Sequence, residues 1–290
     1  MNDYEQKYTR NKMALITGTA GGLGKAFAVE CASRRWDVFL TDLSTGPLEV
    51  LAAGLRNGYR VKVITHACDL ADPASRSALY DRIQSEQLVF STLINVAGID
   101  HEGLFYEQSN RQIQSIIRLN VEGTIAMTHA SLQFRNPLET FHIINVASLA
   151  AFYPMPVKAT YAASKRFLLD FSLALREEIK GIGATVTVLC PAGMPTNPDC
   201  IRGIEAQGWM GQLTTMDVGR VANMTLNAAL AGKAVVIPGL LNWVMQKAGA
   251  LIPVSLLTRL IGRRWMSARN KNIQEGVLAI SRKVLRSCEL

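Results

Sequence analysis

Three side chains that are able to move a proton, Ser148, Tyr161 and Lys165, lie downstream of a glycine-rich turn at residues 17–24. Tyr161 and Lys165 are four residues apart, which places both on one face of a helix. A tyrosine titrates near about pH 10, and a neighbouring ammonium group favours its phenolate form. We therefore expect Lys165 to lower the pKa of Tyr161, so that the phenol can take a proton from an alcohol or give one to a ketone. Ser148 would hold the substrate oxygen with a second hydrogen bond.

The glycine-rich turn reads TGTAGGLG, follows an apolar run that predicts a strand, and opens a predicted helix. Glycines let the backbone turn tightly and approach a pyrophosphate, and the helix N-terminus offers free N–H groups with a partial positive charge. A turn used only for packing is the alternative. Its place ahead of a proton-transferring trio favours a nicotinamide dinucleotide, bound through Gly18, Gly22, Leu23 and Gly24. The positive charge of the oxidised nicotinamide should add to that of Lys165 in lowering the pKa of Tyr161.

Asp42 follows the second predicted strand, eighteen residues after Gly24. A carboxylate at this place can accept both ribose hydroxyls of an adenosine and repels a 2′-phosphate. The next residues include no Lys or Arg, and Arg34 and Arg35 precede the strand at its opposite end. We therefore expect a preference for NAD(H) over NADP(H). The alternative is that Asp42 only caps a turn.

Apolar runs of strand length alternate with stretches of helical periodicity, and this alternation predicts the fold. Val, Ile and Leu dominate the runs without strict in-out alternation, as in parallel strands buried on both faces. An α/β, Rossmann-like, doubly wound parallel sheet of about seven strands with helices on both faces follows. The predicted strands are 13–17, 38–41, 61–65, 92–96, 141–146, 185–189 and 235–237, and the predicted helices are 23–34, 47–57, 73–86, 108–132, 161–180 and 216–231.

Two stretches break this rhythm. Residues 191–215 are rich in Gly, Pro, Asn and Met and are long for a strand-to-helix connection, which is typical of a lid. Residues 241–290 follow the last predicted strand. We expect a dinucleotide-binding domain with the active site over 1–240, and a basic amphipathic helical extension over 241–290.

These motifs together resemble the short-chain dehydrogenase/reductase family, in the branch with a TGxxxGxG turn and a YxxxK active site. The resemblance covers residues 11–240 and adds further matches in the expected order. Two departures are Val96, where the family often has Asn, and Ala192, where it usually has Gly. The further matches are Asp69 and Leu70 after the third strand, Asn95, Ala97 and Gly98 at the fourth, Asn120 in the next helix, Pro191, and Thr196 five residues later.

The resemblance implies a role for each matched position. Asp69 and Leu70 would contact the adenine, and Asn95 would brace the sheet near Ala97 and Gly98. Pro191 and Thr196 would lie at the nicotinamide, with Thr196 on its carboxamide. Lys165 would also bind the nicotinamide ribose, and Asn120 would position water in a proton relay beside Ser148 and Tyr161. The resemblance also implies a homo-oligomer, a dimer or tetramer.

Apolar side chains flank the predicted chemistry. They follow Ser148 and recur in the 191–215 stretch, so that we expect a pocket for a lipophilic secondary alcohol or ketone such as a hydroxysteroid, bile acid or fatty chain. Packing of the loops is the alternative role of these residues. The side chains assigned to substrate are Phe152, Tyr153, Met194 and Trp209.

The net charge of +8 belongs mainly to the C-terminal segment, which has nine Lys and Arg but two acids after residue 240. Leu257, Leu260, Ile261 and Trp265 fall at helical spacing beside Arg259 and Arg263, typical of a helix on an anionic membrane. A cap over the pocket or a subunit contact is the alternative. Because basic residues are not interleaved with aromatics along a groove, we expect no nucleic-acid partner.

Five scattered cysteines without a paired spacing indicate reduced thiols and no metal site. The polar N-terminal residues lack a secretory signal pattern, so we expect a cytoplasmic protein, with or without peripheral membrane contact through residues 240–270. An NAD-sensing binding protein is the main alternative from another class. A nucleotide-sugar epimerase would share Tyr161 and Lys165, but usually has a larger substrate domain than this length allows.

Overall fold

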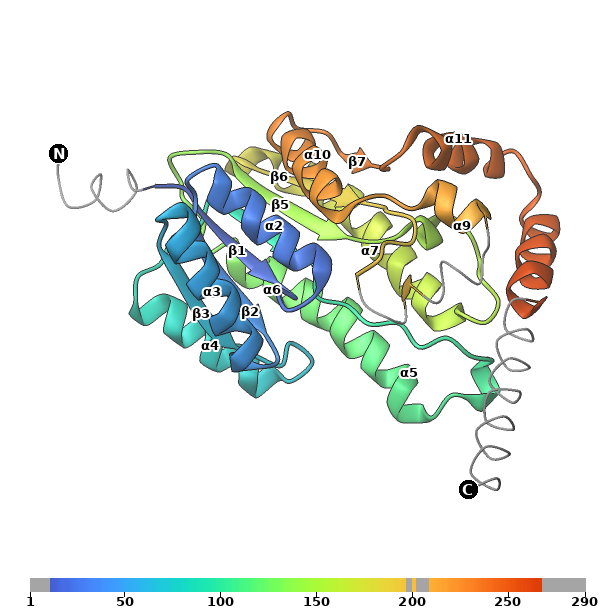
Figure 1. Cartoon of the computed structure of the whole chain (residues 1–290), viewed down its shortest axis with the longest axis horizontal. Coiled ribbons are helices and arrows are strands. Elements are labelled where there is room, and N and C mark those ends of the chain that lie inside the picture. The colour runs from blue at the N-terminus through green and yellow to red at the C-terminus, as the bar shows by residue number, and fades with distance from the viewer. Residues whose placement is uncertain (1–10, 197–199, 202–208, 268–290) are drawn as a thin grey trace, which may run out of the picture.

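The computed structural model describes residues 11–196, 200–201 and 209–267, with the backbone alone at 209–211. Its centre is one seven-stranded sheet in the order β3-β2-β1-β4-β5-β6-β7, with every neighbouring pair parallel (Figure 1). The predicted parallel sheet is thereby confirmed. The strands are β1 (Met13–Thr17), β2 (Asp37–Asp42), β3 (Val63–Ala67), β4 (Thr92–Asn95), β5 (Phe141–Val146), β6 (Ala184–Leu189) and β7 (Val235–Val236).

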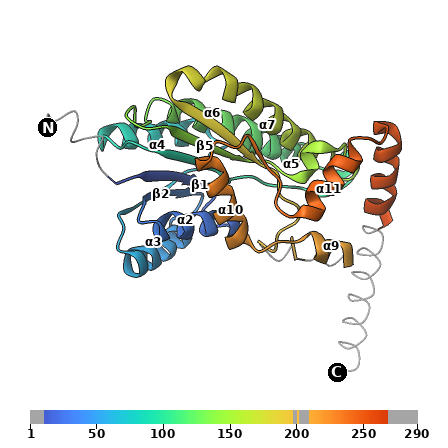
Figure 2. The same ribbon diagram turned by 90° about the horizontal axis from the view of Figure 1, so that it is seen from above.

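Helices cover both faces of the sheet, as Figure 2 shows. One face holds α2 (Gly22–Ser33), α3 (Thr45–Tyr59) and α10 (Val218–Leu230). The other holds α4 (Pro73–Ser85), α5 (Asn110–Ile116), α6 (Thr124–Ser131) and α7 (Ala159–Glu178). Short helices η1 (Phe105–Glu107), η3 (Leu149–Phe152), η4 (Lys180–Ile182) and α9 (Trp209–Thr214) join these elements.

Each face has a separate apolar core because the strands direct alternate side chains to opposite sides. Phe27, Leu48 and Leu226 belong to the core under α2, α3 and α10. Leu79 and Met127 belong to the core under α4, α6 and α7. With both faces covered, the strands read as continuous apolar runs, which is the pattern that predicted them.

The strand order reverses at the centre of the sheet. From β1 the chain proceeds to β2 and β3 on one side, and then returns to place β4 on the other side. Such a switch leaves a crevice at the carboxyl ends of the two central strands, where open α/β sheets bind ligands. The elements following β1 and β4 therefore determine what this protein can bind.

The predicted helix over 108–132 is one continuous helical stretch with a change of register inside it. The stretch passes from α5 through the π-helix η2 (Ile117–Gly123) into α6. A π-helical turn within an α-helix is frequently found at a functional site. Asn120 lies in this turn and is fully buried.

Beyond β7 the chain continues into a helical C-terminal segment, consisting of α11 (Leu240–Gly249) and a helix over 254–267. Both helices lie past the carboxyl ends of the strands (Figures 1 and 2). None of the helices in the described part of the chain is long and apolar enough to cross a bilayer. The predicted extension beyond residue 267 lies outside the described residues, as does part of the predicted lid over 191–215.

Candidate active site

The glycine-rich turn lies in the crevice between β1 and β4, where its glycines permit close backbone approach. Gly18 has φ +70°, and a Cβ on it would lie 2.7 Å from the Cα of Ala97 after β4. A Cβ on Gly24 would lie 2.1 Å from the carbonyl oxygen of Gly18. Side chains at Gly18 and Gly24 would therefore collide with the backbone, which fixes the shape of the turn.

This turn presents the N-terminus of α2 to the crevice. The N-cap is Gly21, which has no side chain to occupy the first N–H groups, and the first turn of α2 holds no acid. These N–H groups and the helix dipole favour an anion. The backbone of Thr196 lies on the same spot, with its Cα 3.1 Å from the position of a Cβ on Gly22. The turn therefore fits a pyrophosphate, and Thr196 is brought next to it from the distant loop after β6.

Asp42 ends β2 beside the glycine-rich turn. Its Oδ2 accepts a hydrogen bond from the backbone N–H of Ala20 at 2.7 Å, and its Oδ1 accepts one from the N–H of Leu43 at 2.8 Å. Each carboxylate oxygen has a second lone pair and can also accept from a hydroxyl.

At the other end of β2, Arg34 pairs with Glu30, and Arg35 donates to the carbonyl of Tyr59. The two arginines lie away from this carboxylate, as the sequence predicted.

The residues after β3 form the next part of the crevice. Asp69 accepts a hydrogen bond from the N–H of Ala71 at 2.9 Å, and Leu70 is buried. A Cβ on Gly123 of η2 would lie 2.9 Å from the carbonyl oxygen of Leu70. The π-helical stretch therefore packs directly on the segment expected to contact the adenine.

Hydrogen bonds between strands hold the end of β4 in place. Asn95 donates to Thr128 of α6 at 3.0 Å and to Asn145 of β5 at 2.9 Å. Thr17 at the end of β1 accepts hydrogen bonds from the N–H groups of Val96 and Ala97, at 3.1 and 3.2 Å. Thr17, Thr128 and Asn145 were not expected from the sequence, since each meets a partner that is distant along the chain.

The four candidate catalytic residues converge beside this crevice. Ser148 begins η3, accepts a hydrogen bond from the N–H of Ala150 at 3.1 Å, and hydrogen-bonds with the phenol of Tyr161. The Lys165 ammonium lies 5.7 Å from the centroid of the Tyr161 ring and donates to the carbonyl of Val146 at 2.9 Å. A serine from the end of β5 therefore meets a tyrosine of α7, and the ammonium group of Lys165 lies beside the tyrosine ring.

Asn120 completes the group from the opposite side. Its side chain accepts from the N–H of Ile99 at 2.9 Å and donates to the Ile99 carbonyl and to Ser164, at 2.9 and 3.1 Å. Asn120 Oδ1 and Lys165 Nζ lie equally close, at 3.2 Å, to the position of a Cβ on Gly98. Gly98 therefore has no side chain because the amide and the ammonium group occupy that space.

A lowered pKa was expected for Tyr161 beside Lys165 and an oxidised nicotinamide, but in the protein by itself the pKa of Tyr161 is raised. Burial, together with the charge of Asp100, raises the pKa of Tyr161 to about 12, against a smaller opposing effect of the Ser148 hydrogen bond. Burial also lowers the pKa of Lys165 to about 8. Desolvation disfavours the charged forms of both groups, and it is the largest cause of both shifts.

The loop after β6 begins with Pro191, whose carbonyl accepts a hydrogen bond from the N–H of Leu149 at 2.8 Å. This bond joins the loop to η3 beside Ser148. Ala192 and Gly193 both have a negative φ. The alanine in place of the usual glycine is therefore accommodated without backbone strain.

The four predicted substrate side chains lie in different surroundings. Phe152 packs at the edge of a small core around Leu168, and Met194 packs against the core under α2. The Tyr153 hydroxyl donates to the carbonyl of Met245 in the C-terminal segment at 3.0 Å. The side chain of Trp209 lies outside the described residues.

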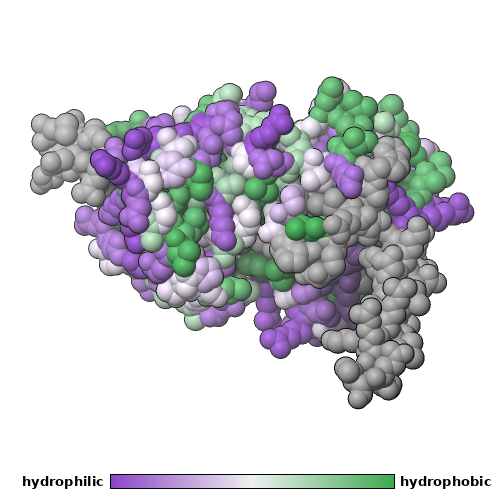
Figure 3. Space-filling model, viewed as in Figure 1, coloured by the Kyte–Doolittle hydropathy of each residue, from purple (hydrophilic) through white to green (hydrophobic). Residues whose placement is uncertain are grey.

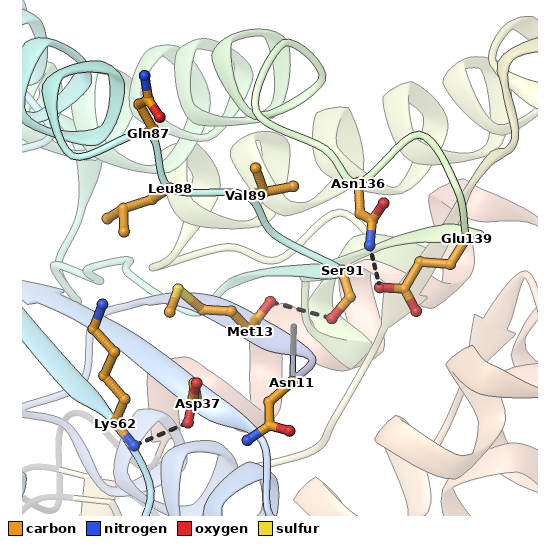
Figure 4. A pocket seen from close by; sticks show the side chains of 10 residues that line it. All are labelled: Asn11, Met13, Asp37, Lys62, Gln87, Leu88, Val89, Ser91, Asn136 and Glu139. Carbon is orange, nitrogen blue, oxygen red and sulfur yellow. Dashed lines mark hydrogen bonds between the residues drawn. The ribbon is translucent and has the colours of Figure 1, made fainter. Parts of the chain in front are cut away.

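A cavity of about 270 Å³ lies elsewhere, at the amino ends of β1 and β2 (Figure 4). Its lining includes Met13, Asp37, Lys62 and Glu139. Because ligands of parallel α/β sheets bind at the carboxyl ends of the strands, this cavity is on the wrong edge for the predicted chemistry. The converging side chains, rather than this cavity, mark the candidate active site.

Comparison with known proteins agrees with this geometry. Residues 12–199 match the family model described as short chain dehydrogenase. Over 177 residues the chain is 31% identical to the very-long-chain 3-oxoacyl-CoA reductase of Laccaria bicolor, covering 60% of this chain and 52% of the relative. It is also 31% identical over 189 residues to human 17-beta-hydroxysteroid dehydrogenase type 3, covering 63% and 59%. The chain thus spans little more than half the length of these relatives.

A solved structure extends the likeness to three dimensions. A short-chain dehydrogenase from Sphingobium yanoikuyae, in complex with NADPH, superposes with a TM-score of 0.69 at 28% identity, covering 83% of this chain and 96% of that one. The sheet order, the glycine-rich turn at the switch point and the family match lead to the same conclusion. The chain belongs to the short-chain dehydrogenase family.

Proposed function

We propose that this protein is an oxidoreductase that transfers a hydride between a nicotinamide dinucleotide and a secondary alcohol or ketone, with Tyr161 as general acid and base. The observation that carries the proposal is the meeting of Ser148, Tyr161 and Lys165 at the crevice that contains the glycine-rich turn. Each residue alone has a structural explanation, but a dinucleotide turn and a proton-transferring trio at one crevice form a complete site.

The residues of the crevice suit a dinucleotide along its whole length. The turn at Gly18, Gly22, Leu23 and Gly24 would hold the pyrophosphate, Asp42 the adenosine ribose, and Asp69 and Leu70 the adenine. Asn95, Ala97, Gly98, Pro191 and Thr196 would surround the nicotinamide half, with Lys165 on its ribose. When bound, the nicotinamide accepts or supplies the hydride. We propose NAD(H) as the preferred form because the carboxylate of Asp42 is held beside the turn by two backbone N–H groups.

The protonation of Tyr161 bears on the direction of proton transfer. With a pKa of about 12, Tyr161 is a protonated phenol at neutral pH, which is the form that donates a proton to a ketone. For alcohol oxidation the phenolate must form, and the positive charge of the oxidised nicotinamide favours it. Ser148 holds the substrate oxygen, while Asn120 and Lys165 connect the site to a proton relay.

A lipophilic substrate is the next part of the proposal. Phe152 and Tyr153 follow Ser148 in the chain, Met194 lies in the loop after β6, and Trp209 begins α9. The two relatives described above bear names that refer to very-long-chain acyl and steroid substrates. Both features support a hydroxysteroid, bile acid or fatty chain over a small polar alcohol.

We further propose that this protein, cytoplasmic and a homo-oligomer, contacts membranes through residues 240–267. The hydrophobic area over α11 is visible in Figure 3. Leu240 is 78% exposed and Leu251 is 87% exposed, while this stretch contains Lys247, Arg259, Arg263 and Arg264 and no acid. Exposed apolar side chains ringed by cations suit an anionic lipid surface. A contact between subunits is the competing occupant.

Flotation with lipid vesicles distinguishes a membrane contact from a contact between subunits. Leu251→Asp should release the protein from anionic vesicles, whereas Val50→Asp should not, because Val50 is 76% exposed on α3, away from this surface. Binding that is unchanged by Leu251→Asp would remove the membrane proposal. A change of oligomer size with unchanged lipid binding would assign the surface to a subunit contact.

The central test is the Tyr161→Phe variant with a panel of hydroxysteroids, fatty alcohols and small ketones, assayed with NAD(H) and NADP(H). We expect normal dinucleotide binding and loss of nearly all turnover, since general acid–base catalysis typically contributes about 10²–10⁴-fold. Near-normal turnover would refute the role of Tyr161. Tight NAD binding without turnover by the unaltered protein would instead favour a dinucleotide-sensing protein.

A further inference from the structure

An ion-pair group centred on a half-buried lysine lies next to Tyr161 and has no part in the chemistry described so far. Lys158 is the N-cap residue of α7 and precedes Tyr161 by three residues. Its ammonium pairs with Asp100 and, at 3.2 Å, with Glu102, both in the loop after β4. The Lys158 side chain is 15% exposed, against 28% and 36% for the two acids. The ammonium is therefore largely withdrawn from water, while the two carboxylates remain in contact with it.

Two lysine ammonium groups lie near the ring of Tyr161. Lys158 Nζ lies 5.8 Å from the ring centroid, and Lys165 Nζ lies 5.7 Å from it. Lys158 Nζ also lies 5.0 Å from the ring of Trp265, in the helix over 254–267. One lysine thus connects the candidate catalytic tyrosine, the loop after β4 and the C-terminal segment.

The backbone at this lysine is held in an unusual conformation. Val157 has φ +73°, a region that β-branched residues rarely adopt, and its carbonyl accepts a hydrogen bond from the N–H of Gly103 at 2.9 Å. Such strain persists only where surrounding contacts impose it. The ion pairs of Lys158 and the bond between Gly103 and Val157 join the same two loops, and so fix where α7 begins.

The charges around Tyr161 are of both signs. Asp100 disfavours the phenolate, as does Cys200, while Lys158 and the hydrogen bond from Ser148 favour it. Asp100 and Glu102 hold the pKa of Lys158 above its ordinary value, although burial opposes this. Lys158 therefore keeps its positive charge throughout the range in which the protein would work.

We propose that Lys158 is a positioning residue that, through its pairs with Asp100 and Glu102, sets both the place of Tyr161 and its affinity for a proton. This inference rests on the proposed function of Tyr161 as acid and base. Removal of the ammonium leaves the negative charge of Asp100 near the phenol without its partner, whereas removal of Asp100 leaves the ammonium paired with Glu102 alone. The two changes therefore act on Tyr161 in opposite directions, which a purely structural role would not do.

The test is the pH dependence of kcat/KM for alcohol oxidation, which rises as Tyr161 loses its proton. Lys158→Met should move this rise to higher pH, and Asp100→Asn should move it to lower pH, each by about half a unit to one unit. Lys158→Arg should restore the original profile. Lys180→Met is the matched control, because Lys180 pairs with Glu177 at an exposed site.

A measurement without turnover keeps this inference separate from the proposed function. Ultraviolet titration of each variant, in difference against the same variant with Tyr161→Phe, reports the ionisation of this one phenol. A higher pKa of Tyr161 in Lys158→Met and a lower one in Asp100→Asn, in proteins with unchanged circular dichroism, support the proposal even if the substrate is wrongly assigned. If the pKa of Tyr161 moves in the same direction in both variants, or does not move, the proposal is overturned even if Tyr161 proves essential for turnover.

Discussion

The cofactor side and the substrate side of the crevice are built by different means. On the cofactor side, backbone meets backbone, as where Gly18 approaches Ala97 and Gly24 approaches the carbonyl of Gly18. On the substrate side, side chains from distant segments meet. Tyr153 bonds to the carbonyl of Met245, and Lys158 contacts both Asp100 and Trp265.

This difference indicates how each side can vary. A turn made of backbone contacts leaves no room for an added atom, so its sequence is restricted and its shape is fixed. A site wall made of side-chain contacts can exchange single contacts at a cost of about 1 kcal/mol each. One scaffold can therefore keep a constant cofactor site beside a substrate site that is open to change.

The largest effect is expected on the cofactor side, from Gly24→Ala. The new Cβ would lie 2.1 Å from the carbonyl oxygen of Gly18, so that the backbone of the turn must move. We expect a loss of at least about 3 kcal/mol in the free energy of unfolding, at or above the upper end for overpacking. Dinucleotide binding, followed by tryptophan fluorescence, should be lost.

Gly54→Ala is the matched control, because a Cβ on Gly54 of α3 would meet nothing within 4 Å. Alanine in a helix interior should stabilise the protein by up to about 1 kcal/mol. Equal destabilisation by the two substitutions would show that the close backbone contact at Gly24 does not restrict the turn.

The second effect concerns Lys165, whose burial lowers its pKa from 10.5 to about 8. The folded state binds this proton less tightly than the unfolded state, so that stability rises with pH between these two values. Lys165→Met should therefore be more stable than the unaltered protein at pH 7 by about 3 kcal/mol, although inactive. This advantage should fade as the pH rises from about 8 to 10.5, as urea denaturation can measure.

The exposed Lys180 provides the control for this substitution. Lys180→Met should change stability by less than about 0.5 kcal/mol at every pH, as is usual for a surface site. If Lys165→Met is destabilised at pH 7, then the bond of Lys165 to the Val146 carbonyl outweighs the cost of burying the charge.

Features that depend on neighbouring residues can be predicted from the sequence, whereas contacts between distant segments cannot. The strands, the glycine-rich turn and Asp42 depend on residues close together in the chain, and the structure has them near where local pattern puts them, although β3 begins at Val63 instead of residue 61. The π-helical turn at Asn120 and the hydrogen bonds of Thr17 depend on packing between distant segments. Thr17 and Ala97 are 80 residues apart, and Tyr153 and Met245 are 92 apart. No local spacing indicates such pairs.

The pKa of Tyr161 shows the same limit in electrostatics. The spacing of Tyr161 and Lys165 was enough to place the two groups together, but not to show how far water is excluded from them. The surroundings of Tyr161 include Asp100 after β4 and Cys200 after β6, which reach the site from elsewhere in the chain. The sign of the shift is therefore a property of the assembled site.

A smaller effect is expected from Asp42→Asn. The substitution removes the charge that repels a 2′-phosphate and weakens a charge-assisted hydrogen bond that contributes about 1.5–3 kcal/mol. NAD affinity should fall about tenfold, while NADP affinity rises, as measured by calorimetric titration of both dinucleotides. Asp37→Asn, at the opposite end of β2, is the control and should change neither affinity. Unchanged discrimination in Asp42→Asn would leave Asp42 as a turn-capping residue only.

The smallest effect is expected on the substrate side, from Tyr153→Phe. The substitution removes the hydrogen bond to the Met245 carbonyl and keeps the ring, which lies close to Gly249. A loss of about 1 kcal/mol should appear only in the C-terminal segment, as faster hydrogen exchange over α11 with an unchanged midpoint of global unfolding. Tyr80→Phe is the control, since its hydroxyl contacts only the sulfur of Met127 at 3.8 Å among the contacts described, and it should leave α11 unaffected. If exchange instead quickens through β1 and α2 as well, the two sides of the crevice unfold as one unit. The substrate side would then be no freer to vary than the glycine-rich turn.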